Sequence, residues 1–440
     1  MDLATFLIQR YFHSTKGELS IGEVAVSKLA NRYGTPLFVY DRSVIDKKWN
    51  ILRDALPPEF SIYYSVKANP NLTIIQHLLS KGAGLEIASG GEFYQALGAG
   101  CNPEKLIFAG PGKTEAELEL VLGQGIGEIH VESLLEAERI ATIAQRRGMR
   151  ARVALRVNPC GDVEGGAMRM GGRSAPFGVD EETLDEVLEQ LLSFPALNLR
   201  GIHLFTGTQI LDFEILANQY RRGLEIARSV AVRQHKPLAT VDFGGGLGIP
   251  YFPHERDLDM PKMRQALDTL LKPVLEDPLF SGTQFLTEPG RYLVGEAGVY
   301  LLRVNDIKVS RGKKFLILDG GMNHHLAASG NLGQTIKRNY PVAVLNKLHC
   351  QPEEVVDLVG PLCTPLDVLG RNVNLPRAEV GDLVGVFQSG AYARSASPLG
   401  FLSHAAPPEV WVDRGLVSLI RHRGDYRDYL RDQCFDSSPA

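Results

Sequence analysis

The chain has 440 residues, of which 44% are hydrophobic and 22% are charged. This length and balance predict a globular protein of more than one domain and argue against large-scale disorder. The formal net charge of −4 argues against a nucleic-acid-binding protein, which would usually carry a basic surface.

The N-terminal residues 1–7 contain an early acid and no long apolar run, so they do not indicate a secretory signal. No window approaches the ~20 apolar residues of a membrane span. The five cysteines are widely spaced, which favours reduced thiols and a cytoplasmic protein over a disulfide framework. No cysteine pair has metal-ligand spacing, and the adjacent His324 and His325 would face opposite ways on a strand. We therefore expect no metal site.

The first two thirds of the chain alternate between short apolar runs typical of strands and amphipathic segments typical of helices. Residues 36–41 form an early strand that could pair with strands much later in the chain. Eight consecutive β-then-α units follow, and they predict the α/β class with a parallel (β/α)8 TIM-like barrel over residues 36–290. The expected barrel strands are residues 62–68, 84–89, 105–109, 128–132, 152–157, 199–205, 240–243 and 284–287. Helices are expected at residues 115–122, 134–147, 181–194 and 215–234.

After about residue 293 the pattern changes to strands punctuated by glycine and proline. The expected strands are residues 300–309, 314–319, 354–359, 383–388 and 410–412. Residues 291–422, together with residues 1–35, therefore predict a second, mainly β domain. Residues 423–440 are polar and are expected to form a flexible tail.

Polar residues and glycines collect at the ends of six barrel strands, which a purely structural barrel would not require. They are residues 67–70, 86–92, 156–159, 205–209, 242–248 and 288–291. Barrel enzymes carry their chemistry at the C-terminal ends of the strands. These six segments are therefore the expected site.

Lys67 lies in the apolar stretch that forms the first barrel strand. Burial would lower the pKa of its amine, and a neutral amine can form a Schiff base. A strand-end lysine that extends to water is the alternative interpretation.

Residues 244–248, which are Gly-Gly-Gly-Leu-Gly, follow the seventh strand, where barrels commonly hold phosphate on backbone N–H groups. A tight turn is the alternative. Glu288, at the end of the eighth strand, would suit the protonated nitrogen of a pyridine ring, although a surface pair with Arg291 would also explain it. His203 has apolar neighbours, and we expect it to be a satisfied core histidine.

Six motifs, taken together, resemble the alanine-racemase-fold (fold type III) pyridoxal-phosphate decarboxylases, which include diaminopimelate, ornithine and arginine decarboxylases. The likeness extends over about residues 30–415, with the motifs in the family's order. The motifs are residues 64–69, 86–92, 244–248, 288–291, 363–367 and 390–392. The resemblance implies pyridoxal 5′-phosphate as cofactor and a homodimer whose active sites lie at the subunit interface.

Matching positions imply a role for each site residue. Lys67 would be the Schiff-base lysine, Glu288 would bond the pyridine nitrogen, and Cys363 would enter from the partner subunit to protonate Cα. The remaining cofactor contacts implied by the resemblance are Glu86 and Arg156 near the ring, and Gly245, Gly246, Gly290, Arg291 and Tyr392 at the phosphate, with Thr208 where the family usually has a serine.

The chain departs from the family pattern at two positions. Phe205 stands where the family has a histidine stacked on the cofactor; an aromatic ring can stack, but it cannot donate a hydrogen bond. Thr364 stands where an acidic residue usually meets the substrate's distal ammonium, a contact worth about 1.5–3 kcal/mol. The sequence therefore argues against a free diamino acid as substrate, with Thr364 and Asp367 as the expected substrate-binding residues.

The Cys-Thr-Pro-x-Asp variant at residues 363–367 resembles a narrower subgroup, and residues 110–113 and 168–178 support this. That subgroup includes siderophore decarboxylases and decarboxylases of glutamyl groups tethered to an acyl carrier protein. We therefore expect a decarboxylase of an amino acid with a conjugated distal end, in secondary-metabolite or siderophore biosynthesis. The alternatives are a diaminopimelate decarboxylase of lysine biosynthesis, an amino-acid racemase, and an inactive decarboxylase-like binding protein.

Overall fold

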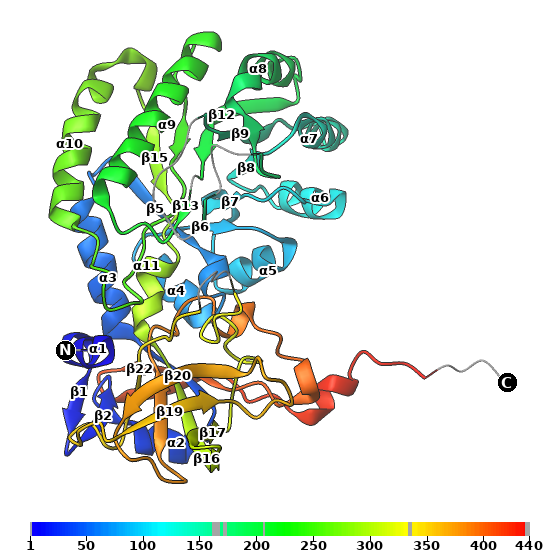
Figure 1. The fold of residues 1–440 in the computed structure, drawn as a ribbon. Helices are drawn as coiled ribbons and strands as arrows, with labels where there is room; N and C mark the ends of the chain where they lie inside the picture. Colours follow the sequence, from blue (N-terminus) through cyan, green and yellow to red (C-terminus); the bar gives the residue numbers. More distant parts are fainter. Residues whose placement is uncertain (1, 161–167, 170–173, 206, 333–336, 436–440) are drawn as a thin grey trace. The chain divides into compact units, whose positions relative to one another are not determined.

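The computed structural model describes residues 2–160, 168–169, 174–205, 207–332 and 337–435, which form two compact units (Figure 1). One unit, called the β unit below, comprises Met1–Lys47, Tyr251–Glu255 and Leu293–Ala440. The other, called the barrel unit, comprises Lys48–Pro250 and Arg256–Tyr292.

Parallel strands form the centre of the barrel unit. They are β5 (Phe60–Ser65), β6 (Gly84–Ile87), β7 (Leu106–Phe108), β8 (Glu128–Val131), β9 (Ala151–Asn158), β12 (Leu197–Leu204), β14 (Thr240–Asp242) and β15 (Gln284–Thr287). Each pairs in parallel with the next, and the pairing of β15 with β5 closes the ring. The expected eight-stranded barrel is therefore confirmed. The short β11 (Val179–Asp180) extends β9, and β10 (Met168–Arg169) pairs with β13 (Gly207–Thr208).

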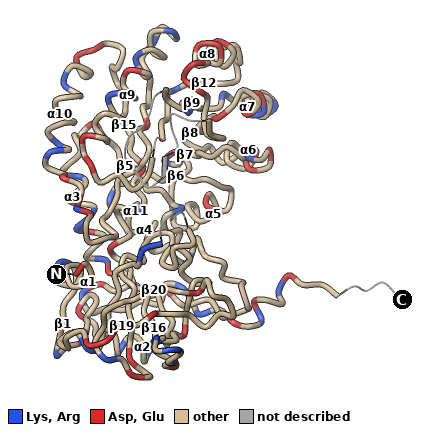
Figure 2. The backbone as a smooth tube through the Cα atoms, viewed as in Figure 1, with Lys and Arg blue, Asp and Glu red and all other residues tan. Residues whose placement is uncertain are grey.

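Helices lie before, between and after the barrel strands along the chain. They are α3 (Arg42–Ala55), α4 (Leu72–Ser80), α5 (Gly90–Gly98), α6 (Glu115–Gly123), α7 (Leu134–Arg146), α8 (Leu184–Leu192), α9 (Phe213–Arg233), α10 (Met260–Glu276) and the short α11 (Arg291–Val294). Several of them, α4–α7, α9 and α10, begin at a side-chain cap, such as the capping box of Thr114 and Glu117 at α6. Basic and acidic residues are interspersed along these helices, as the near-neutral composition leads one to expect (Figure 2).

The β unit contains the early strand β4 (Leu37–Asp41) at the centre of a mixed sheet. Its order is β20-β19-β17-β16-β4-β22-β23, and β21 pairs with both β16 and β18. The strands are β16 (Gly298–Ser310), β17 (Lys313–Leu318), β18 (Val342–Val344), β19 (Glu354–Val359), β20 (Val368–Leu375), β21 (Leu383–Val386), β22 (Glu409–Asp413) and β23 (Leu416–Arg421). Before β4 come α1 (Leu3–Tyr11), β1 (His13–Thr15), β2 (Glu18–Ile21), β3 (Val24–Ala25) and α2 (Val26–Tyr33).

The structure assigns residues 36–47 to the β unit and not to the barrel, which differs from the expected boundary. The reason is hydrogen bonding, since β4 pairs antiparallel with β16 and parallel with β22. The predicted pairing of this strand with the later domain is confirmed. Within the expected tail, residues Tyr426–Leu430 form a 3₁₀ helix, and residues 436–440 lie outside the described part of the chain. Among the residues described, no helix has the length and apolar character needed to span a bilayer.

Candidate active site

Lys67 lies just past the end of β5, in the 3₁₀ turn Val66–Ala68. The expectation that it sits buried within the strand is wrong, because its side chain is 41% exposed. Its Nζ atom lies 3.0 Å from both carboxylate oxygens of Glu86, which is buried at the end of β6. Ser65 donates a hydrogen bond of 2.5 Å to Glu86 Oε2. A buried, oriented carboxylate therefore holds the amine at the mouth of the barrel.

Glu92 lies beside this pair in the first turn of α5 and was not singled out from the sequence. Burial, to which the charge of Glu86 adds, raises the pKa of Glu92 to about 7. Its Oε2 accepts the Ala88 N–H at 2.7 Å. A carboxyl group with a pKa near neutral therefore lies within electrostatic reach of Lys67 and Glu86.

Arg156, in β9, forms a buried ion pair with Glu132, whose Oε1 lies 2.7 Å from Arg156 Nη1. Glu132 also accepts the backbone N–H groups of Gly110 at 2.6 Å and Gly178 at 3.0 Å. Burial opposes ionisation of Glu132, but Arg156 and these hydrogen bonds outweigh it and lower the pKa of that carboxyl. Gly110 and Gly178, each at one end of a segment quoted for the subgroup, thus converge on one carboxylate that the sequence analysis missed.

Phe205, at the end of β12, lies between two cations. Lys67 Nζ is 5.9 Å from its ring centroid, and the Arg156 guanidinium carbon is 6.0 Å away. The same guanidinium lies 5.0 Å from the Phe177 ring. Cation–π attraction therefore orients the aromatic side chain that replaces the family's histidine. Thr206, which follows it, lies outside the described residues, and Thr208 belongs to β13.

The glycine loop after β14 joins the ends of three strands. Gly246 has φ +102, a conformation that favours glycine, and a Cβ on Gly245 would lie 2.5 Å from the carbonyl oxygen of Glu288. Gly244 accepts the Glu288 N–H at 2.8 Å. A Cβ on Gly290 would lie 2.9 Å from the Cβ of Ala68, just after Lys67. The loop therefore places bare backbone beside the ends of β12 and β15, while Gly290, just after β15, lies close to the lysine turn.

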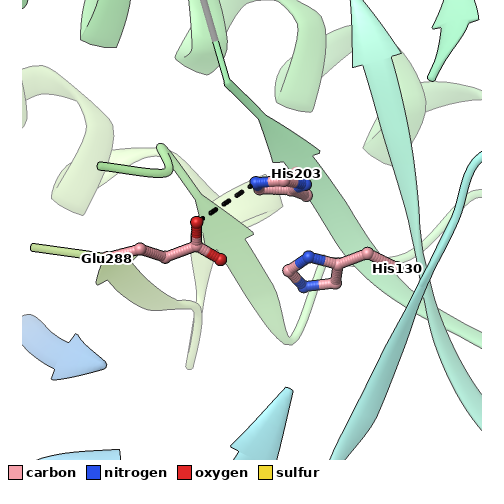
Figure 3. A group of neighbouring side chains, drawn as sticks. All are labelled: His130, His203 and Glu288. Atoms are coloured by element: carbon pink, nitrogen blue, oxygen red, sulfur yellow. Dashed lines mark ion pairs between the residues drawn. The ribbon is translucent and has the colours of Figure 1, made fainter. Parts of the chain in front are cut away.

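Glu288 and His203 lie in the barrel interior, where Figure 3 shows them with His130. Glu288 Oε2 is 3.5 Å from His203 Nε2, and Glu288 Oε1 has no hydrogen-bond partner among the described residues. The expectation that His203 is satisfied in the core is wrong, because neither ring nitrogen has a hydrogen-bond partner within the described part of the chain. Its ring stacks on His130 at 4.2 Å. The donor atoms of all three side chains lie within 4.8 Å of one another, a grouping that the sequence did not reveal.

A comparison with protein families decides the class of the molecule. Residues 42–295 match the family described as pyridoxal-dependent decarboxylase, pyridoxal binding domain. The chain belongs to this family. It is therefore a pyridoxal-phosphate-dependent amino-acid decarboxylase, which sets aside the racemase and the inactive binding protein.

Several relatives resemble the decarboxylase over nearly its whole length. It is 37% identical over 418 residues to the L-glutamyl-[BtrI acyl-carrier protein] decarboxylase of Niallia circulans, covering 94% of this chain and 97% of that protein. It is 34% identical to the diaminopimelate decarboxylase of Methanothermobacter thermautotrophicus, over 95% of this chain and 96% of that protein. Among solved structures, the diaminopimelate decarboxylase from M. jannaschi superposes with a TM-score of 0.88 at 28% sequence identity. The superposition covers 98% of this chain and 99% of that one.

Three features of the barrel unit fit pyridoxal phosphate. The unsatisfied, buried Glu288 Oε1 is an acceptor for a ring N–H, the glycine loop offers backbone N–H groups to a phosphate, and Lys67 supplies an amine. Arg291 follows Gly290 at the start of α11, next to the same strand end. The structure thus brings Lys67, Glu86, Arg156 and Phe205 together, while their individual roles remain predictions.

The β unit holds the remaining predicted site residues. Cys363 is exposed, and Thr364 Oγ1 accepts the Leu366 N–H at 3.3 Å. Asp367 is buried; one of its oxygens accepts the Met322 N–H at 2.6 Å, and the other accepts the Leu362 N–H at 2.9 Å. Tyr392 has φ +52 and follows Gly390 and Ala391. Asp367 therefore orders its own loop, between β19 and β20.

Proposed function

We propose that this decarboxylase removes the α-carboxylate of an amino acid whose distal end is conjugated, such as a carrier-tethered glutamyl group or a citryl-diaminopropionyl compound. The loop at residues 362–367 carries the proposal, since Asp367 is its only acid and both oxygens of that acid accept backbone N–H groups. Thr364 follows Cys363 where an acid would be needed to pair with a free distal ammonium. A substrate without that ammonium avoids the loss of a charge-assisted contact.

The name of one relative supports the same substrate class. The protein of Niallia circulans acts, by its name, on a glutamyl group attached to an acyl carrier protein. Relatives at 34% identity are named diaminopimelate decarboxylases, which keeps that substrate as the second candidate. We infer a place in secondary-metabolite or siderophore biosynthesis for the first case and in lysine biosynthesis for the second.

The chain's own residues divide the work in this proposal. When bound, the cofactor supplies an electron sink for the bond that breaks. Lys67 holds the cofactor covalently, and Glu86 with Ser65 orients its amine. Glu288 would hold a proton at the ring nitrogen, and the Phe205 ring would stack on the cofactor. Thr208, Gly245, Gly246, Gly290 and Arg291 would hold the phosphate, and the resemblance assigns Tyr392 to it as well.

Protonation of Cα completes the proposed reaction. We assign the proton to the exposed Cys363 thiol, supplied from the second subunit of a homodimer. Thr364 faces the distal part of the substrate, and Asp367 acts on it indirectly by fixing the loop. Light scattering of the purified protein tests the dimer; a monomer that retains full activity would contradict a shared site.

A CO₂-release screen tests the substrate class. It compares free diaminopimelate, ornithine and lysine with a carrier-linked glutamyl group and with citryl-diaminopropionate, at equal concentrations. We expect at least tenfold higher kcat/KM for a conjugated compound. Highest kcat/KM for free diaminopimelate would contradict the proposal and favour the second candidate.

A further inference from the structure

The interior of the barrel below Glu288 is polar, whereas bulky apolar side chains usually fill a barrel of this kind. Glu128 and His130 come from β8, His203 from β12 and Asp242 from β14, and all four are buried. Buried ionisable groups are costly unless they are paired, so this column of side chains calls for a specific explanation.

The members of the column lie close to one another, although neither imidazole has a hydrogen-bond partner in the described part of the chain. His203 Nε2 is 3.5 Å from Glu288 Oε2, and the His203 ring stacks on His130 at 4.2 Å. His130 Nε2 lies 3.5 Å from Glu128 Oε1 and 3.8 Å from Asp242 Oδ2. The groups therefore form one contiguous cluster from Glu128 to Glu288, held by ring stacking and by charge at ion-pair distances.

The charges of the column do not balance if every carboxyl group is ionised. Glu128, Asp242 and Glu288 would contribute three negative charges, and burial lowers the pKa of His203 well below its ordinary value, so that imidazole is neutral. Two cations lie near the column: Arg200, whose Nε is 3.5 Å from Glu128 Oε2, and Arg156, whose charge acts on His203. At least one carboxyl group must therefore keep a proton.

Asp242 is the group best placed to keep it. Burial, together with the charge of Glu288, raises the pKa of Asp242 well above its ordinary value. Asp242 Oδ1 accepts the Gly244 N–H at 2.8 Å, while its Oδ2 has no hydrogen-bond partner among the described residues. The free Oδ2 can carry the proton without disturbing the glycine loop.

We propose that Asp242, His203 and His130 are positioning residues that hold the shared protons of this column, so that Glu288 remains a carboxylate and the cofactor's ring nitrogen remains protonated. This rests on the cofactor being the one shown for the family, and not on the proposed substrate. Neutral His203 directs Nε2 towards Glu288 Oε2 at 3.5 Å, and a protonated Asp242 places no second negative charge beside Glu288. Neutral partners around Glu288 leave its negative charge to pair with a protonated ring nitrogen.

The surrounding charged groups are compatible with this assignment. Glu86, Glu132 and Arg156 face the column from the site end, while Arg200 and Tyr63 face it from the other end. Burial, to which the charge of Glu128 adds, raises the pKa of Tyr63 to about 12, so its hydroxyl stays neutral. A metal ion held by His130, His203 and Glu288 is the competing explanation, and it would occupy the carboxylate that the ring nitrogen needs.

The test measures the ring nitrogen directly. The holoenzyme is prepared with pyridoxal phosphate labelled with ¹⁵N in the ring, and the ¹⁵N chemical shift reports whether that nitrogen is protonated. We expect the protonated shift in the wild type, in Asp242→Asn and in His203→Gln, because both amides are neutral and donate. We expect a displacement towards the unprotonated shift in Asp242→Leu and His203→Leu, together with about tenfold lower kcat and less than twofold change in KM.

The paired variants separate positioning from a purely structural role. If a leucine variant fails to fold, the glutamine and asparagine variants still decide, because loss of the protonated shift in either would overturn the proposal. An unchanged shift in both leucine variants would also overturn it. Elemental analysis completes the test, and one bound zinc or other transition metal per subunit would refute the assignment in favour of the metal.

Discussion

Lys67 and Glu86 form a bidentate ion pair in which the two partners differ in environment. The Glu86 side chain is 1% exposed and that of Lys67 is 41% exposed, with Nζ 3.0 Å from each carboxylate oxygen. Ser65 fixes the Glu86 carboxylate by a hydrogen bond, and this carboxylate orients the Lys67 amine from the buried side. The amine remains accessible to a ligand on its exposed side. Much of the expected behaviour of the site follows from this pair.

Replacing Glu86 with Gln should weaken the hold on the amine without unfolding the barrel. The variant loses the charge-assisted contact, which is worth about 1.5–3 kcal/mol, so we expect cofactor affinity to fall roughly 10–100-fold. Fluorescence titration of the cofactor-free protein measures it. Affinity within twofold of wild type would show that the pair does not act on the cofactor.

Replacing Glu132 with Gln should lower the free energy of unfolding by about 3–5 kcal/mol, because the buried Arg156 would keep its charge without a counter-ion. Urea unfolding followed by circular dichroism measures the change. Arg228→Met is the matched control, since its pair with Asp277 is on the surface and should contribute less than about 1 kcal/mol. Equal losses in the two variants would contradict the account of Glu132.

Glu92 should make the protein less stable as the pH rises. Its folded pKa of about 7 exceeds the ordinary value of 4.5, so the folded state holds the proton more tightly and its advantage is lost as pH rises between these two values. Relative to the wild type, Glu92→Gln should therefore gain on the order of 2–3 kcal/mol between pH 4.5 and pH 8. Thermal melts of both proteins across this range provide the comparison, and parallel curves would disprove the assignment.

Thr364→Glu should improve the use of free diamino acids if a missing distal charge sets specificity. We expect kcat/KM for diaminopimelate to rise about tenfold, with Thr364→Gln as the uncharged control of equal size. The CO₂-release assay serves here as well. A rise in both variants, or in neither, would argue against charge as the discriminator.

Cys363→Ala should slow turnover and allow protonation from the wrong face or oxidation at Cα. Cys363→Ser retains a weaker proton donor of similar size and should fall between the wild type and the alanine variant. Analysis of the product in deuterated water, by NMR and chiral chromatography, distinguishes these outcomes. Identical rates and stereochemistry in all three proteins would remove Cys363 from the mechanism.

The barrel could be predicted from sequence because its strands and helices repeat with clear periods. The eight expected strands correspond to β5–β9, β12, β14 and β15, and the expected helix at residues 215–234 appears as α9, Phe213–Arg233. The position of Lys67 was harder to predict, since the apolar pattern continues through Val66 while the chain turns where Gly290 packs against it. The hydrophobic pattern of a sequence cannot predict such a close contact between Gly290 and the residues around Lys67.

The charged interior could not be predicted because its members are far apart in the chain. His130 and His203 each lie among apolar neighbours, and only barrel closure stacks their rings. Glu132 likewise follows a strand without any motif, yet it binds Arg156, Gly110 and Gly178. Alternate strands contribute to one interior layer, so such clusters emerge only when the register of the barrel is known.

Borohydride reduction of the reconstituted protein, followed by peptide mass spectrometry, tests the central claim most directly. The account predicts one pyridoxyl adduct per chain, on the peptide that contains Lys67, and no adduct in Lys67→Arg. It would be contradicted by an unmodified Lys67 peptide, or by an adduct on another lysine such as the buried Lys113, in protein that releases CO₂ from its substrate.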